Sequence, residues 1–249
     1  MRGSAAYDTI GVGYASARRP DPRITARIVE ALGDARRVVN VGAGTGSYEP
    51  AGRAVVAVEP SAVMLAQRGD DAAPVVRGFA EALPFPDDAF DAAMGVLTVH
   101  HWTDLDAGLA ELRRVAPRRV VLGFDEPRVS SSFWLVSDYF PETSAIESAR
   151  APQLDQLVDG LGANRIEVVP VPHDCTDGFA GAYWRRPEAY LDPVVRAGIS
   201  SFAEMDDAEL EPGLTRLRAD LESGAWHERH AALTELDEID LGYRLIITD

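Results

Sequence analysis

A glycine-rich turn that directly follows an apolar run is the most distinctive chemical feature of the sequence. Residues 38–41, Val-Val-Asn-Val, lead into Gly42-Ala43-Gly44-Thr45-Gly46, and the next apolar run, 54–58, ends at Glu59. Glycines adopt positive φ at little cost and let a ligand approach the backbone closely. In an open α/β sheet, ligands bind beyond the carboxyl ends of the strands. A carboxylate at that edge can accept hydrogen bonds from both hydroxyls of a ribose, so the pattern predicts a nucleoside site.

Two departures separate this turn from the phosphate-binding motifs. The dinucleotide fingerprint requires a third glycine where Ser47 stands, and the sequence holds no lysine to grip a phosphate chain. A nucleoside without a pyrophosphate therefore fits better than a dinucleotide. The turn is also compatible with a tight strand-to-helix connection that binds no ligand.

These residues need a framework of alternating strands and helices, and the apolar pattern predicts one. Asp21-Pro22 has the cap and first-turn proline of a helix that ends at Gly33, and Ser61 and Asp104 cap two later helices. The expected strands are 38–41, 54–58, 75–76, 91–99, 120–122, 166–171 and 243–247, and a long helical stretch runs from about 179 to 236. This alternation predicts an α/β fold with a parallel sheet covered on both faces.

Composition limits the function classes. The 249 residues include 24 basic residues, all of them arginine, against 40 acidic ones, a net charge of −16. Such a field repels phosphate backbones and anionic membranes, so we expect a small-molecule substrate, no nucleic acid and no membrane partner. The single cysteine excludes a disulfide framework, and no motif with metal-ligand spacing is present, so no metal is expected. The N-terminus has no apolar segment typical of a signal peptide, which favours a cytoplasmic location.

A third segment makes the pattern specific. Residues 78–91, Gly-Phe-Ala-Glu-Ala-Leu-Pro-Phe-Pro-Asp-Asp-Ala-Phe-Asp, precede a strand that leads to His100-His101-Trp102. Together with the glycine turn and Glu59, this order resembles the class I S-adenosylmethionine-dependent methyltransferases that act on small molecules. The resemblance covers about residues 7–125. It implies a Rossmann-like parallel sheet with an antiparallel last strand, in a single domain 1–249 with helical cap elements at about 1–20, 128–150 and 175–236.

The resemblance also implies roles for individual residues toward S-adenosyl-L-methionine. Asn40 stands where the family usually has an acid, and its oxygen would accept from the cofactor ammonium without a full negative charge. The expected contacts are Gly42, Ala43 and Gly44 with the methionine part, Glu59 with the ribose, Pro60 and Met64 with the adenine face, Ala80 and Glu81 with the adenine edge, Gly95 and Val96 near the sulfonium, and Tyr14 and Arg19 in an N-terminal lid whose arginine pairs with the methionine carboxylate.

The acceptor side of the reaction is less defined. His100 and His101 are expected at the end of the fourth strand, where one of them could act as a general base, although many methyl transfers need none. Aromatic residues beyond 130 fit either an apolar substrate pocket or ordinary cap packing: Phe133, Trp134, Tyr139, Phe140, Trp184 and Tyr190. The implied activity is methyl transfer to an O, N, S or C atom by a monomer or homodimer. The alternatives are a cyclase-type enzyme that binds the cofactor without methylating, or a non-catalytic partner protein.

Overall fold

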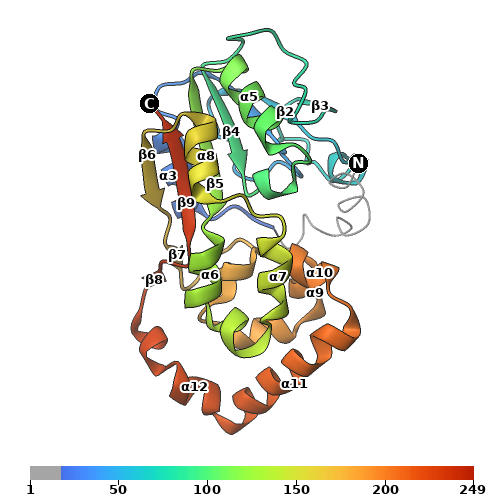
Figure 1. The fold of residues 1–249 in the computed structure, drawn as a ribbon, viewed down its shortest axis with the longest axis vertical. Coiled ribbons are helices and arrows are strands. Elements are labelled where there is room, and N and C mark those ends of the chain that lie inside the picture. The colour runs from blue at the N-terminus through green and yellow to red at the C-terminus, as the bar shows by residue number, and fades with distance from the viewer. Residues whose placement is uncertain (1–17) are drawn as a thin grey trace.

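A seven-stranded sheet forms the upper half of the molecule in the computed structural model, which describes residues 18–249 (Figure 1). The strand order is β3-β2-β1-β4-β5-β9-β6. The strands are β1 (Arg37–Val41), β2 (Ala54–Val58), β3 (Val75–Val76), β4 (Ala92–Val96), β5 (Arg118–Phe124), β6 (Arg165–Val168) and β9 (Tyr243–Thr248). β1, β2, β3, β4 and β5 pair in parallel, whereas β9 is antiparallel to both β5 and β6. The parallel sheet with an antiparallel last strand is therefore confirmed.

Alternating side chains divide the sheet into two buried faces, as expected for strands covered on both sides. Val38 and Val120 pack in one cluster with Ile28 of α3 (Pro22–Ala31). Val39 and Val121 point the other way, into a second cluster with apolar residues of α5 (Leu105–Val115) and α8 (Leu154–Leu161). The helices therefore fix the sheet from both faces and leave its carboxyl edge for a site.

A helical layer lies below this edge in Figure 1 and comes from two stretches of chain. The first contains α6 (Glu126–Ser132), the π-helical turn η2 (Leu135–Tyr139) and α7 (Glu142–Ser148). The second contains η3 (Ala180–Tyr183), η4 (Pro187–Leu191), α9 (Pro193–Ala197), α10 (Ser200–Glu204), α11 (Asp207–Ser223), α12 (Ala225–Arg229) and η5 (Ala231–Glu235). A two-stranded ribbon of β7 (Val171–Pro172) and β8 (Glu238–Ile239) connects it to the sheet region.

Aromatic packing holds the helical layer together. Trp134, Trp184 and Trp226 are buried, and the indole Nε1 of Trp134 donates to the carbonyl of Trp184 over 2.8 Å. Trp134 also contacts Tyr190 and Trp226 edge-on, with ring centroids 5.7 and 5.1 Å apart. Trp134, Trp184 and Tyr190 therefore pack the core of the helical layer, which is one of the two roles that the sequence left open for them. Phe133 lines a cavity described below.

Two strand predictions were too long. The fourth strand ends at Val96 rather than 99, because Leu97 has a φ of +50° and the chain then forms the 3₁₀ helix η1 (Val99–His101). The placement of His100 and His101 at a strand end was therefore wrong. The run 166–171 divides into β6 and β7, since β6 ends at Val168. Between residues 18 and 249, no helix is both long and apolar enough to cross a bilayer.

Candidate functional site

A cavity of about 280 Å³ opens beyond the carboxyl ends of β1, β2 and β4. Its wall begins with the glycine turn after β1 and continues through α4 (Ala62–Leu65) and the segment after β4. This is the position at which open α/β sheets bind ligands.

Gly42 brings the turn close to the segment after β4. Its φ is +70°, and a Cβ added there would lie 1.9 Å from Oγ1 of Thr98. The Gly42 N–H donates to the carbonyl of Val58 over 2.9 Å, which joins the turn to the end of β2. Any larger residue would have to push Thr98 away and adopt a backbone conformation that side chains disfavour. The absence of a side chain at position 42 therefore leaves a concave stretch of backbone, called the cradle below, that a Cβ would fill.

Glu59 connects two parts of the cavity wall. Its side chain is buried, with 6% of the residue exposed. Oε2 accepts from the Gly44 N–H at 2.8 Å, and Oε1 accepts from the Ser61 N–H at 2.9 Å. Ser61 in turn caps α4 by accepting from the Met64 N–H. One carboxylate thus fixes both the glycine turn and the start of α4 around the cavity.

Asn40 contributes a polar atom without a partner. The residue is 1% exposed and lines the cavity, and no residue between 18 and 249 hydrogen-bonds to its Oδ1. A buried acceptor left unsatisfied costs about 1–3 kcal/mol. A cationic donor in the cavity, such as the ammonium of a methionine moiety, would remove that cost. The cradle, the carboxylate and this orphaned oxygen together fit S-adenosylmethionine.

The structure brings most of the predicted site residues to this one cavity. Those that line it are Asn40, Gly42, Ala43, Gly44, Glu59, Pro60, Met64, Ala80, Glu81, Val96 and His101. Gly95, in β4, is not among the lining residues, and His100 lines a different cavity. Arg19 is exposed and is not among the lining residues, and Tyr14 lies outside the described residues. Among residues 18–249, no three His, Cys, Asp or Glu side chains are grouped to hold a metal.

Arg18 lines the cavity, and sequence reasoning missed it. Its Nε donates to Oδ1 of Asp177 at 2.7 Å, and its Nη2 donates to Oδ2 at 3.3 Å. The Tyr48 hydroxyl donates to the same carboxylate at 2.7 Å. Tyr48 and Arg18 both line the cavity, whereas Asp177 is buried behind them. No local signal pointed to Asp177, because it is 159 residues from Arg18 along the chain.

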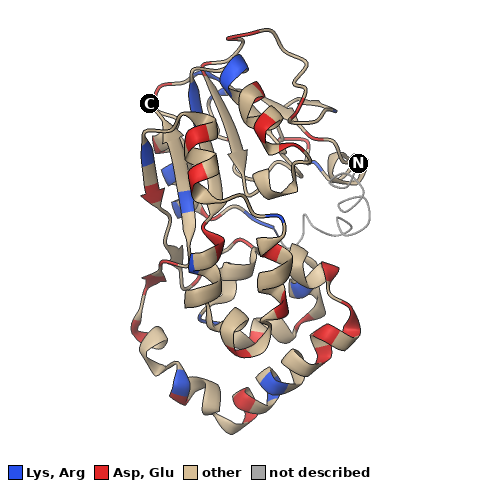
Figure 2. Ribbon diagram, in the orientation of Figure 1, with Lys and Arg blue, Asp and Glu red and all other residues tan. Residues whose placement is uncertain are grey.

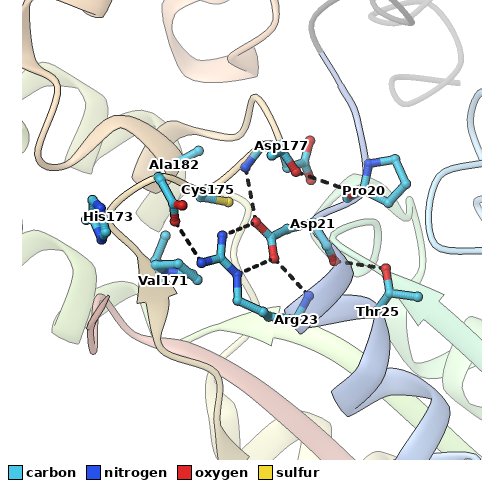
Figure 3. Close-up of polar contacts among 12 residues, drawn as sticks. Pro20, Asp21, Arg23, Thr25, Val171, His173, Cys175, Asp177 and Ala182 are labelled. Carbon is cyan, nitrogen blue, oxygen red and sulfur yellow. Dashed lines mark hydrogen bonds and ion pairs between the residues drawn. The ribbon is translucent and has the colours of Figure 1, made fainter. Parts of the chain in front are cut away.

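A second acidic residue fastens the chain next to Arg18. Figure 3 shows the Asp21 side chain between Arg23 and the segment that carries Cys175 and Asp177. Asp21 accepts from the backbone and side chain of Arg23 and from the Thr176 N–H, and so caps α3. Burial alone would raise the pKa of Asp21, but these hydrogen bonds lower it to about 2. The start of the described chain is therefore held against a loop from the helical half.

Glu81 and Phe79 line the cavity and have different roles. Glu81 Oε1 accepts from the N–H and the hydroxyl of Thr103, at 2.7 and 2.8 Å, and so holds the start of the next helix. Burial opposes ionisation of Glu81, yet hydrogen bonds from its own backbone and from the Thr103 turn lower its pKa. Phe79 lines the cavity with half of its surface exposed, 50%. An exposed aromatic ring at a ligand cavity is a surface on which a flat base can stack.

The adjacent histidines face two cavities. His101 lines the first cavity and His100 the second, and their ring centroids lie 3.9 Å apart. Burial, then the charges of Arg150 and Arg18, lowers the pKa of His100 to about 3. Burial and the neighbouring His100 hold the pKa of His101 well below its usual value. Both imidazoles are therefore neutral at pH 7.

Comparison with known proteins gives a consistent result. Residues 39–122 match the family model described as "Methyltransferase domain". A crystal structure from Anabaena variabilis ATCC 29413, named "Putative methyltransferase from antibiotic biosynthesis pathway", is 38% identical with a TM-score of 0.86. That likeness covers 94% of this chain and 99% of the other.

Two further proteins are less similar, one matched by sequence over part of its length and one matched by fold. "Uncharacterized methyltransferase YcgJ" of Bacillus subtilis (strain 168) is 28% identical over 140 residues, 52% of this chain. The match spans 48% of YcgJ, about half of that relative's length. The likeness to the crystal structure of the [4+2]-cyclase SpnF covers 98% of this chain and 94% of that chain, at 17% identity and a TM-score of 0.55. It is a likeness of fold alone.

Proposed function

The chain belongs to the class I S-adenosylmethionine-dependent methyltransferases, and on that premise we propose that it methylates a small-molecule acceptor. The observation that carries the proposal is the cavity at the carboxyl edge of the sheet, with Glu59 fastened to the Gly44 backbone in its wall. A positive ligand suits this wall, because it contains a buried carboxylate and the unsatisfied oxygen of Asn40.

We propose the following positions for the cofactor. Glu59 holds the ribose, and Asn40 accepts from the ammonium of the methionine part. Phe79 stacks on the adenine, since its ring is exposed to the cavity. Arg18 takes the role expected of Arg19 toward the methionine carboxylate, because Arg18 is the one of the pair that lines the cavity. The remaining assignments are the backbone of Gly42, Ala43 and Gly44 for the methionine part, Pro60 and Met64 for the adenine face, Ala80 and Glu81 for the adenine edge, and Gly95 and Val96 near the sulfonium.

S-adenosylmethionine supplies an electrophilic methyl group on a sulfonium and leaves as a neutral thioether. When bound, it would let an acceptor's lone pair form the new bond as the carbon–sulfur bond breaks, with the proton of an O–H or N–H acceptor passing to solvent. The protein's main contribution is alignment: holding two reactants in attack geometry supplies up to about 7–11 kcal/mol in the best intramolecular models.

General-base catalysis is a smaller part of this mechanism. An efficient base has a pKa near the working pH. With a pKa of about 3, the imidazole of His100 is a weak proton acceptor, and the pKa of His101 is also lowered. We therefore infer that the two histidines act as neutral polar groups beside the reacting atoms.

A small molecule suits this site better than a polymer. The chain carries a net charge of −16, and Figure 2 draws acidic residues among the basic ones over the viewed face, with several on α11. Such a field opposes phosphate backbones. We propose that a single domain, with its helical caps, acts in the cytoplasm as a monomer or homodimer.

The proposal is tested by incubating the purified chain with methyl-labelled S-adenosylmethionine and a panel of candidate acceptors. Transfer of label to an acceptor, with one demethylated cofactor released per product, supports it. Failure of the protein to bind S-adenosylhomocysteine in calorimetry refutes it. An acceptor that is cyclised while the bound cofactor keeps its methyl group would support the cyclase-type alternative, for which the likeness of fold to SpnF is the motive.

A further inference from the structure

A second cavity, of about 90 Å³, lies against the first. The two share Arg18 and Leu97 as wall residues. The second cavity lies between the sheet and the helical layer, because Phe124 comes from β5 while Phe133 and Phe202 come from the helical segments. The two cavities therefore adjoin at Arg18 and Leu97.

The lining of this cavity is mainly apolar. Five phenylalanine and tyrosine rings contribute to it, together with aliphatic side chains of which Leu135, Val136 and Ile199 are buried. The aromatic residues are Phe124, Phe133, Phe179, Phe202 and Tyr243. An apolar wall of this kind favours a ligand that buries apolar surface against it.

The charged groups in the wall are already paired. Arg18 pairs with Asp177 at 2.7 Å and is assigned above to the cofactor's carboxylate, and Glu147 pairs with Arg150 at 2.6 Å. Arg150 also donates to the Ser200 hydroxyl at 3.1 Å, so the cation is held in place. A charged ligand would lose its hydration in this cavity and find no unpaired opposite charge there, which is unfavourable.

The other titratable groups of the wall are neutral. Burial raises the pKa of Tyr243, and burial with the charges of Arg150 and Arg18 keeps His100 uncharged at neutral pH. The Tyr243 hydroxyl accepts from the Gly181 N–H at 3.2 Å. For Nδ1 of His100, residues 18–249 provide no hydrogen-bond partner. The wall therefore offers neutral polar groups and apolar surface.

We propose that this second cavity binds the methyl acceptor, and that the acceptor is an uncharged molecule that inserts a small apolar group of no more than one ring. The inference rests on the proposed methyl transfer. The upper limit of one ring follows from the volume, since an engineered cavity of about 150 Å³ holds one benzene molecule and this cavity, of about 90 Å³, is smaller. The acceptor's nucleophilic atom faces the wall formed by Arg18 and Leu97, and thus the first cavity.

Three para-substituted phenols, one neutral, one anionic and one cationic, test the proposal on the unmodified protein. With S-adenosylhomocysteine at saturation, binding of p-cresol, 4-hydroxybenzoate and tyramine is measured by calorimetry. We expect p-cresol to bind at least about tenfold more tightly than either charged phenol. Equal or tighter binding of a charged phenol overturns the proposal, and so does the absence of p-cresol binding up to its solubility limit.

A matched pair of variants locates the binding. Val136→Trp fills the second cavity, whereas Val194→Trp adds the same side chain to α9 at a position that is 62% exposed. We expect Val136→Trp to weaken p-cresol binding at least tenfold, and both variants to keep the parent affinity for S-adenosylhomocysteine. Equal loss in both variants, or no loss in either, overturns the proposal. If the parent protein binds no S-adenosylhomocysteine, the proposed function fails instead, which is a separate result.

Discussion

Replacing Glu59 with alanine removes the side chain on which the cofactor site depends most. Its carboxylate accepts from the backbone N–H groups of Gly44 and Ser61 at 2.8 and 2.9 Å. A buried donor left without a partner costs ~1–3 kcal/mol. With the low end of this range for each of the two donors, we expect the free energy of unfolding to fall by about 2 kcal/mol.

The same substitution also lowers the affinity for the nucleoside of the cofactor. Two ribose hydroxyls that donate to a carboxylate contribute ~1.5–3 kcal/mol each. Taking the lower value for both, Glu59→Ala loses about 3 kcal/mol of binding free energy, which raises the Kd about 100-fold. The same substitution also releases the Gly44 turn, so the estimate is a lower bound.

Calorimetric titration with S-adenosylhomocysteine measures the affinity, and urea unfolding followed by tryptophan fluorescence measures the stability. Glu30→Ala is the matched control, because it removes the same charge from an exposed position on α3. We expect the control to keep the parent Kd. A folded Glu59→Ala protein that binds S-adenosylhomocysteine as tightly as the parent would refute the placement of the nucleoside in this cavity.

Three further predictions follow from contacts in the site. Gly42→Ala places a Cβ 1.9 Å from Oγ1 of Thr98 and is expected to weaken S-adenosylhomocysteine binding at least tenfold, with partial recovery in Gly42→Ala/Thr98→Gly; calorimetry that finds no loss contradicts the close approach. Asp177→Asn weakens the hold on Arg18 and should raise the Kd severalfold in the same titration, whereas an unchanged Kd would remove Arg18 from the binding site. The pKa of Asp21 is lowered from 3.8 to about 2, so this carboxylate adds stability above pH 4 that is lost as the pH falls toward 2; Asp21→Asn should flatten the acid limb of the unfolding free energy, and an unchanged limb contradicts the assignment.

The succession of strands and helices along the chain and the position of the glycine turn could be predicted from the sequence. Short apolar runs bounded by caps and glycines are local signals, and Asp21, Ser61 and Asp104 cap helices in the structure as expected. Glu59 was also within reach of sequence reasoning, because the carboxyl end of a parallel strand points to the site edge whatever the rest of the fold does.

The ends of elements and the fourth strand's turn were less predictable. Leu97 takes a positive φ, which a non-glycine residue adopts only when its surroundings hold it there. That turn moves His100 and His101 out of the strand and into different cavities. In a strand, adjacent side chains point to opposite faces of the sheet, so the two histidines would also have been separated there. That rule does not apply to the 3₁₀ helix in which they lie.

What the sequence determined by itself was the local part of the site: the glycine turn, the carboxylate after β2 and the sheet that carries them. Which arginine lines the cavity depends on contacts between distant segments, since Arg18 is held there by Asp177, 159 residues away along the chain. The same is true of the second cavity, whose walls come from β5 and both helical segments. Local propensities act over a few residues, whereas such distant partners are selected by the packing of the whole chain.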